Sequence, residues 1–328
     1  MTTGAEGVPA GPGTGAGTGT GAGTVTKAGP GRTPKAAAPG QSGGIKRGIA
    51  SRIVARTGGG AVAVGLVLVA LFWLMPTFGL LVSSLRSPED TGTTGWWKVF
   101  SEPGQITWTN YDKLLSNDDM MRAFFNTIWI TVPSTLLVII IGALAAYAFA
   151  WLEFPGRDWL FLIVVGLLVV PVQVALIPIS KLYGETNLFG TIFGVVLFHV
   201  AFGLPFAVFL LRNYFAGIPK DLLEAARMDG GTDLTIFFRV ILPLGLPAIA
   251  SLGIFQFLWV WNDMLIALIY ADTDSAPLTV ALQSQSRAFG ANIEVLAPGA
   301  FLSLIVPLMV FFAFQRYFVQ GVMAGAVK

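Results

Sequence analysis

Residues 123–152 read AFFNTIWITVPSTLLVIIIGALAAYAFAWL, a run of 30 residues without one charged side chain. About 20 apolar residues in a helix cross the roughly 30 Å hydrocarbon core of a bilayer. Inside that core the backbone finds no water, so a helix, which satisfies its own N–H and C=O groups, is the expected form. This stretch therefore predicts a transmembrane helix.

The rest of the chain has the composition of a membrane protein. Of 328 residues, 54% are hydrophobic and 12% are charged, which is about half the charged share of an average soluble domain and excludes a soluble enzyme. Charge-free apolar stretches recur, and we expect an all-α polytopic protein with six transmembrane helices. The expected spans lie at about residues 61–84, 124–151, 159–180, 188–211, 241–262 and 298–318.

Side chains that most catalytic and metal sites need are scarce. The chain has no Cys and a single His, His199, which excludes disulfides, thiol nucleophiles, Cys-ligated metals and a His-rich metal site. The net charge of +2 is too weak to indicate nucleic-acid binding. An intramembrane enzyme is also disfavoured, because the sequence offers no plausible Ser/His, Asp/Asp or metal-binding set of catalytic residues.

Basic residues are distributed unequally between the two sides of the six spans. Fourteen Lys and Arg fall on the side that holds both termini, and six fall on the other side. Since loops rich in Lys and Arg stay in the cytoplasm, both termini are expected there. Residues 1–56 form a basic tail rich in Gly, Thr and Ala, which we expect to be disordered because it has too few apolar side chains for a core. Residues 57–328 form the membrane domain.

The loop between the fourth and fifth spans, residues 218–243, has the pattern of an organised element. Pro219 suits the first turn of a helix, and Gly230 suits the left-handed cap that ends one. At about 100° per residue, the helix has two different sides. One holds Pro219, Leu222, Leu223, Ala226 and Gly230, and the other holds Lys220, Asp221, Glu224, Arg227 and Met228.

Ion pairs and a second short helix are also expected in this loop. Glu224 has the spacing to pair with Lys220 and with Arg227 on the helix surface. Thr232 can cap a second helix that runs through Phe238 and ends before the Leu-Pro step at 242–243. A two-sided helix at the membrane surface is suited to present a rigid knob to a partner.

The same loop carries a family pattern. Glu224-Ala225-Ala226, three residues, Gly230, nine residues and Val240-Ile241-Leu242-Pro243 resemble the EAA loop of ABC importer permeases, with Val240 in place of Ile. Other segments resemble the carbohydrate (maltose-type) branch of these permeases, over about residues 61–328. They are FPGR at 154–157, VQVALIP at 172–178, GLPF at 203–206, FQFLWVWND at 255–263 and GVMAGAVK at 321–328.

The resemblance implies a permease subunit of an ATP-driven sugar importer in the bacterial inner membrane. Its partners would be a cytoplasmic ATPase dimer, a second homologous permease and an extracellular sugar-binding protein, lipid-anchored or periplasmic. The chain has no GxxxxGK[ST] phosphate loop, so ATP would be bound by the partner, and the chain would be no enzyme and need no cofactor. The implied ATPase-docking residues are Glu224, Ala225, Ala226, Asp229, Gly230, Leu242 and Pro243, and the implied ATPase-interface tail contains Gly321, Gly325 and Lys328.

Polar residues within membrane spans are costly, and they are candidates for the substrate pathway. Planar polar groups beside aromatic rings suit a sugar, which favours the cluster that ends the fifth span. His199 is either a structural interhelical partner or a sugar contact, and the Asn-Asp pair at 262–263 is either a pathway wall or part of an interfacial anchor. The candidate pathway residues are Gln256, Trp259, Asn262, Asp263 and Gln173.

Two further readings of the function remain open. An importer permease of the same machinery could serve another solute, such as amino acids or peptides. A secondary transporter would show an inverted repeat or charges at the midplane, and the six stretches show neither. For the sugar itself, the segment 278–283 and the C-terminal tail look most like α-glucoside-type members, so a di- or oligosaccharide is expected.

Overall fold

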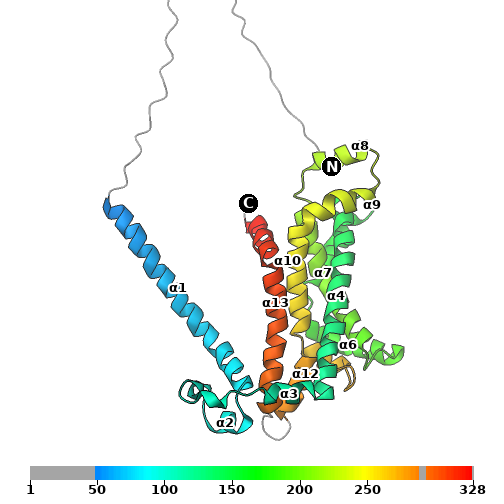
Figure 1. Cartoon of the computed structure of the whole chain (residues 1–328). Coiled ribbons are helices and arrows are strands. Elements are labelled where there is room, and N and C mark those ends of the chain that lie inside the picture. The colour runs from blue at the N-terminus through cyan, green and yellow to red at the C-terminus, as the bar shows by residue number, and fades with distance from the viewer. Residues whose placement is uncertain (1–48, 288–292, 327–328) are drawn as a thin grey trace, which may run out of the picture. The chain divides into compact units, whose positions relative to one another are not determined.

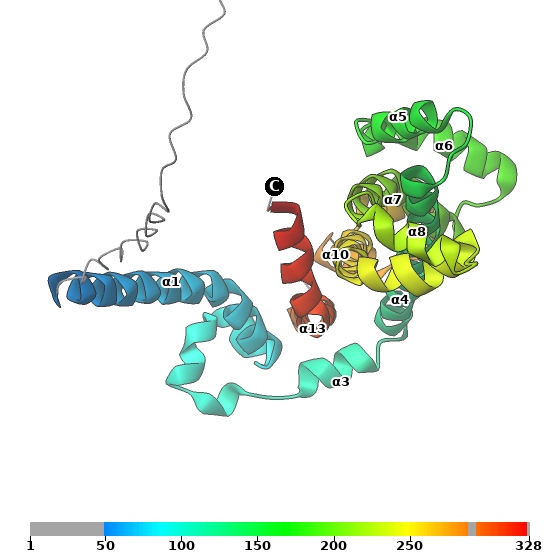
Figure 2. The same ribbon diagram turned by 90° about the horizontal axis from the view of Figure 1, so that it is seen from above.

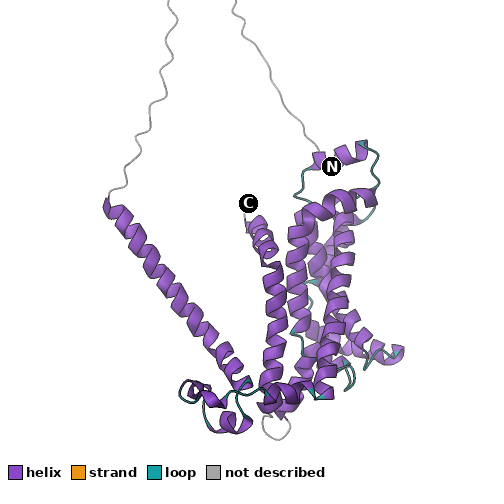
Figure 3. Ribbon diagram, in the orientation of Figure 1, coloured by secondary structure: helices purple, strands orange, loops and turns teal. Residues whose placement is uncertain are grey.

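The computed structural model describes residues 49–287 and 293–326, and these fold into helices and loops (Figure 3). One isolated β-bridge, between Arg86 and Ile106, is the extent of β-structure in the described ranges. The chain divides into two compact units, Met1–Val62 and Ala63–Lys328. The long helices are α1 (Ile49–Ser84), α4 (Asp118–Trp151), α7 (Ile192–Phe215), α10 (Leu242–Trp261) and α13 (Ile293–Ala326).

Shorter helices fill the connections between the long ones. Between α1 and α4 lie α2 (Pro88–Thr93), η1 (Trp96–Phe100), η2 (Pro103–Gln105) and α3 (Thr109–Leu115). Between α4 and α10 lie α5 (Arg157–Leu167), α6 (Val172–Thr186), α8 (Lys220–Met228), α9 (Asp233–Ile236) and the π-helical turn η3 (Phe237–Ile241). Before α13 come α11 (Leu265–Tyr270) and α12 (Leu278–Arg287).

Five of the expected membrane spans are confirmed as single helical segments. The segments long and apolar enough to cross a bilayer are Val62–Ser84, Asp118–Trp151, Ile192–Phe215, Asp233–Trp261 and Val295–Arg316. The helix α1 begins at Ile49, before the expected end of the tail at residue 56, which stays a prediction. The remainder of the expected tail, residues 1–48, lies outside the described residues.

The third expected span, 159–180, is not one straight helix. It consists of α5 and α6, which are bent by 101° at the break between them. By length and apolar composition, the described residues therefore contain six candidate spans if this pair is one broken span and five otherwise. Pro171 precedes α6 directly. Proline disfavours helical geometry in the residue before it and cannot donate an N–H to the preceding turn, which explains why the helix stops at this place.

The helices α4, α7 and α10 form the packed centre of the second unit, with α13 beside α10 (Figure 2). Ala143, Ala146 and Ala207 are at most 2% exposed where α4 meets α7. Small side chains let two membrane helices approach closely and gain packing energy. Leu211, Phe215 and Leu252 extend the same cluster toward α8. In Figure 1, α8 lies at one end of this bundle and α12 at the other.

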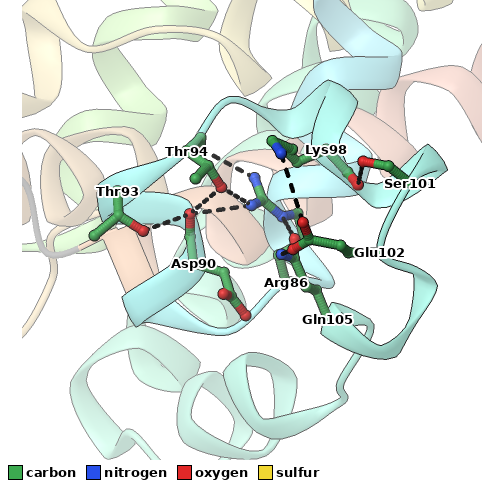
Figure 4. Close-up of polar contacts among 8 residues, drawn as sticks. All are labelled: Arg86, Asp90, Thr93, Thr94, Lys98, Ser101, Glu102 and Gln105. Atoms are coloured by element: carbon green, nitrogen blue, oxygen red, sulfur yellow. Dashed lines mark hydrogen bonds and ion pairs between the residues drawn. The ribbon is translucent and has the colours of Figure 1, made fainter.

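The segment between α1 and α4 is organised around a buried arginine (Figure 4). Arg86 is fully buried, and its Nε donates to Gln105 Oε1 at 2.9 Å. Its Nη1 donates to the Thr94 carbonyl at 3.1 Å, and its Nη2 donates to the Asp90 carbonyl at 3.0 Å and to the Thr94 hydroxyl. A buried guanidinium is tolerated only when its donors are satisfied, so this arginine fixes the connection in one shape.

Candidate functional site

Helix α8 ends in a complete glycine cap, as its sequence predicts. Gly230 has φ +82° and follows Asp229, where the helix stops. The Gly230 N–H donates to the Arg227 carbonyl and the Gly231 N–H donates to the Ala226 carbonyl, both at 3.0 Å. These two bonds define a Schellman motif. The expected left-handed cap at Gly230 is confirmed.

Gly231 is a second cap residue, which sequence reasoning missed. A Cβ at this position would lie 2.8 Å from the Ala226 carbonyl oxygen, whereas one at Gly230 would meet nothing within 4 Å. The signal was present as a Gly-Gly pair after the helix. The two glycines are therefore required for different reasons, one for its backbone conformation and one for space.

The packed face of α8 is narrower than expected. Leu223 is 1% exposed and joins the cluster of Ile218, Ile236 and neighbouring apolar side chains. Leu222, which was expected on the same side, is 46% exposed. The reason is that α8 is only nine residues long and rests on the bundle through Leu223, with Ala226 packed at the edge of the cluster.

The exposed face of α8 and α9 combines charged and apolar groups. Glu224, Ala225 and Asp229 are exposed, as the docking residues of a surface helix would be. Met228 is 88% exposed, and the apolar residues that follow the cap are also largely uncovered, Leu234 at 64% and Phe238 at 56%. Leu234 and Phe238 belong to the segment Asp233–Trp261, which is long and apolar enough to cross a membrane. The exposed residues of α8 itself are therefore the ones suited to a protein partner.

One of the two expected ion pairs on α8 forms. Lys220 Nζ lies 2.9 Å from Glu224 Oε1, and this contact raises the pKa of Lys220 above its ordinary value. Arg227 does not pair with Glu224; its Nη2 lies 3.4 Å from Asp233 Oδ1. The Tyr147 hydroxyl donates to the same Asp233 oxygen at 3.3 Å. Asp233 therefore connects α8 to α4.

The chain after the cap does not break where it was expected to. Thr232 caps α9 through its hydroxyl, which accepts from the Thr235 N–H, as predicted. The expected end of this helix before Leu242 and Pro243 is wrong, because η3 continues directly into α10. The Leu242 N–H donates to the Phe237 carbonyl, five residues back. A π turn of this kind lets the helix run on into a proline step.

The expected C-terminal tail is partly within the described residues. Gly321 and Gly325 belong to α13, which continues to Ala326, and Lys328 lies outside the described residues. In Figure 1, α13 runs from the end of the bundle near α12 toward the end where α8 lies. The tail and α8 are thus at the same end of the bundle.

A groove of about 290 Å³ lies between α7 and α10. Its lining brings together two of the five pathway candidates, Gln256 and Trp259, with four residues that sequence reasoning did not select: Phe202, Gly203, Phe206 and Phe255. The aromatic residues recur at intervals of four on both helices, Phe202 with Phe206 and Phe255 with Trp259. This spacing places side chains on one helix face, and it was the available signal.

Gln256 is the polar group of this groove. It is 4% exposed, and its Nε2 has no hydrogen-bond partner among the described residues. Most buried polar atoms in proteins are paired, and an exception calls for an explanation. The groove therefore offers aromatic surface and one unused donor.

The other three pathway candidates do not line the groove. Gln173 is an exposed residue in the first turn of α6. Asn262 is exposed, and its side-chain amide donates to the Leu258 carbonyl at 2.8 Å. The Asp263 carboxylate accepts the N–H groups of Ile266 and Ala267, each at 3.2 Å, and so caps the start of α11.

His199 lies behind the groove wall. It is 1% exposed, and its ring meets the Trp259 ring edge to face, with centroids 5.1 Å apart. Its Nε2 lies 3.6 Å from Asp263 Oδ2. Neither ring nitrogen has a hydrogen-bond partner in the described part of the chain, so His199 supports the Trp259 side of the groove through ring packing.

Comparisons with known proteins agree on one kind of protein. A family described as "Binding-protein-dependent transport system inner membrane component" matches residues 118–324. The osmoprotective compounds uptake permease protein GgtD of Synechocystis sp. is 50% identical over 81% of this chain and 91% of that protein. The alpha-glucoside transport system permease protein AglG of Rhizobium meliloti is 49% identical over 69% of this chain and 61% of that protein.

A solved structure has a similar fold. A chain of a bacterial ABC transporter involved in the import of the acidic polysaccharide alginate superposes with a TM-score of 0.68 at 25% identity. The match covers 80% of this chain and 97% of that chain.

Proposed function

The chain belongs to the family of binding-protein-dependent transport system inner membrane components, and we propose that it forms, with a second permease, the pathway of an ATP-driven importer for a di- or oligosaccharide. ATP is hydrolysed by a separate cytoplasmic ATPase dimer, and the sugar is delivered by an extracellular binding protein. The chain acts by moving its helices, not by chemistry of its own.

The observation that carries this proposal is the construction of α8. It is a short helix with a fixed cap, one buried anchor and an exposed face of mixed charge and apolar surface. The anchor at Leu223 and the Asp233 contacts tie it to α4 and α10, which continue through the membrane bundle. A push on α8 by a moving partner is therefore transmitted to α4 and to α10, and α10 borders the groove.

The distribution of basic residues supports an orientation of the chain in the membrane. The fourteen basic residues on the terminal side include those of the α8 loop, and basic loops remain cytoplasmic. We place α8, the C-terminal end of α13 and the N-terminus in the cytoplasm, and α12 and the Arg86 segment outside. The C-terminal end of α13, which includes Gly321 and Gly325, would then face the ATPase dimer.

The named relatives favour two solute classes. The relative from Rhizobium meliloti is named for α-glucosides, which supports a sugar with an α-glucosidic bond. The relative from Synechocystis is named for osmoprotective compounds, which favours a second candidate, a compatible solute. The aromatic groove with its amide donor favours the sugar, because a sugar ring has both an apolar face and hydroxyl groups.

The test is uptake of radiolabelled maltose and trehalose by cells in which the chain is replaced by variants. Glu224→Lys reverses the charge at the exposed face of α8 and is expected to abolish uptake, and Gly230→Ala is expected to reduce it. Glu185→Lys, the same change at an exposed glutamate of α6, is the matched control and should transport normally. Normal membrane levels with undiminished uptake in Glu224→Lys would contradict the proposal.

A further inference from the structure

We infer that the groove between α7 and α10 is a binding subsite for a single sugar ring, with the Gln256 amide as its hydrogen-bond donor. This inference rests on the proposed function and assigns part of the recognition to this chain itself. Three features of the groove lead to it: a buried donor without a partner in the described part of the chain, three exposed aromatic rings and a glycine that makes room for the donor.

The buried amide donor of Gln256 is the strongest of these three features. Leaving a buried N–H without a partner is unfavourable, and α10 is otherwise an almost wholly apolar helix. Gln256 lines the groove and is 4% exposed, with its Nε2 unpaired within the described part of the chain. A hydroxyl or ring oxygen of a passing sugar would supply the missing acceptor.

The aromatic side chains that line the groove match the apolar face of a sugar ring. Phe206, Phe255 and Trp259 are 39%, 45% and 37% exposed, so each ring offers part of its face to the groove. Ligand sites combine such apolar and aromatic walls with a few placed polar groups, in cavities of about 300–1,000 Å³. At about 290 Å³ the groove is at the small end of that range, which suits one ring and not a whole oligosaccharide.

Gly203 is the residue that permits this arrangement. A Cβ at position 203 would lie 2.8 Å from both Nε2 and Oε1 of Gln256 and 2.9 Å from Val138 Cγ2. Even alanine would therefore push the amide away from its present place. The close approach of α7 to the amide thus depends on glycine.

The site is tested with the whole importer in proteoliposomes, with its second permease, ATPase and binding protein. Maltose and trehalose are the sugar probes, and glycine betaine is the probe for a compatible solute without a sugar ring. Because the binding protein sets the concentration dependence of uptake, the informative quantity is solute carried per ATP hydrolysed. A series of monodeoxy maltoses, each lacking one hydroxyl, identifies the acceptor.

Gln256→Leu and Trp259→Leu are each expected to lower sugar carried per ATP about tenfold, with the ATPase rate stimulated by the loaded binding protein changed less than about twofold. Gly203→Ala is expected to act like Gln256→Leu. Trp129→Leu, at an exposed tryptophan of α4 outside the groove, is the matched control and should equal the wild type. The wild type should discriminate against one deoxymaltose, and Gln256→Leu should lose that discrimination.

A stability measurement separates a binding role from a packing role. Replacing an unpaired buried donor by an apolar group of similar size removes a cost, so Gln256→Leu should unfold at the same or a higher temperature than the wild type. A lower unfolding temperature, together with an equal loss for every deoxymaltose, would overturn the inference in favour of a structural role.

The remaining outcomes distinguish the two proposals. If the wild type carries maltose or trehalose and Gln256→Leu carries as much per ATP, the subsite is refuted and the importer function stands. If the wild type carries glycine betaine and neither sugar, both the sugar function and the subsite are refuted.

Discussion

The loop helix α8 and the groove between α7 and α10 use the same kinds of side chain in opposite ways. On α8 the charged groups are exposed, Lys220 pairs with Glu224, and a single buried leucine anchors the helix. In the groove the aromatic groups are partly exposed, and Gln256 is buried with its Nε2 unpaired among the residues that the structure describes. A protein that stays bound needs a rigid, projecting surface. A solute that moves through the pathway needs a surface with a hydrogen-bonding group that is still free to bind it. This difference supports the proposals that α8 contacts the ATPase and that the groove contacts the transported sugar.

The largest effect should come from the anchor of α8. Leu223→Ala removes a fully buried side chain, which typically costs about 2–5 kcal/mol, and should detach α8 from the bundle. Hydrogen exchange of residues 220–231 in the purified importer should accelerate strongly. Leu222→Ala, at the exposed neighbouring leucine, should change the opening free energy obtained from the exchange rates by less than about 0.5 kcal/mol. Equal effects of the two variants would contradict the single-anchor description.

The next effect separates the two cap glycines. Gly231→Ala forces a methyl group against the Ala226 carbonyl and should destabilise the α8 cap by about 2 kcal/mol. Gly230→Ala keeps space but holds alanine at positive φ, which costs about 1 kcal/mol. Gly230→Asn should cost less than Gly230→Ala, since Asn tolerates the left-handed region. Hydrogen exchange of α8 gives the order, and a larger effect at Gly230 than at Gly231 would reverse this explanation.

A smaller effect tests whether Asp263 belongs to the cargo site or to the scaffold. Its carboxylate caps α11 through two N–H groups, so Asp263→Ala should lower stability by about 1 kcal/mol, as the loss of a helix cap does. Asp263→Asn keeps an acceptor oxygen and should remain close to the wild type in both unfolding temperature and sugar carried per ATP. A severe transport loss in Asp263→Asn, without loss of stability, would place this carboxylate in contact with the sugar.

The smallest effect concerns the ion pair on α8. Glu224 raises the pKa of Lys220 above 10.5, so the pair favours the folded helix below the unfolded pKa, and this contribution disappears as pH rises through the folded pKa. Transport near neutral pH should therefore be insensitive to this titration. Carbon-13 NMR of labelled lysine, assigned with Lys220→Arg, should show a lower pKa in Glu224→Gln. An unchanged pKa would mean that the two groups do not pair in solution.

The sequence predicted α8 well because its signals are local. Pro219, Thr232 and Gly230 act through their own backbone geometry or bonds to residues a few positions away, and such spacing is readable from sequence. The exposure of Leu222 was not readable, since it depends on how narrow the surface beneath α8 is. The π turn that carries the helix through Pro243 also depends on the continuation into α10.

Only some of the residues that line the groove were predicted from the sequence. Gln256 and Trp259 stood out because polar and aromatic groups are conspicuous in a membrane span, but Phe202 and Phe206 lie on another helix and join them through the packing of α7 on α10. The gaps between charged residues indicated the apolar stretches, but they did not indicate the bend between α5 and α6. The Arg86 hydrogen bonds, which connect residues 86–105, are likewise a product of tertiary folding.

The most direct test of the account is a site-specific cross-link from α8, made easy because the chain has no Cys. In Met228→Cys, at a residue that is 88% exposed, the new thiol is coupled through the maleimide of a short maleimide–diazirine reagent in native membranes. Light then inserts the diazirine end into any side chain or backbone within reach, and the product is identified by mass spectrometry. Trp108→Cys, at an exposed residue preceding α3, is the control from the opposite end of the bundle. The account predicts a cross-link to a nucleotide-binding ATPase from position 228 and none from position 108. An ATPase product from position 108, or none from position 228, would contradict the assignment of α8 to the motor.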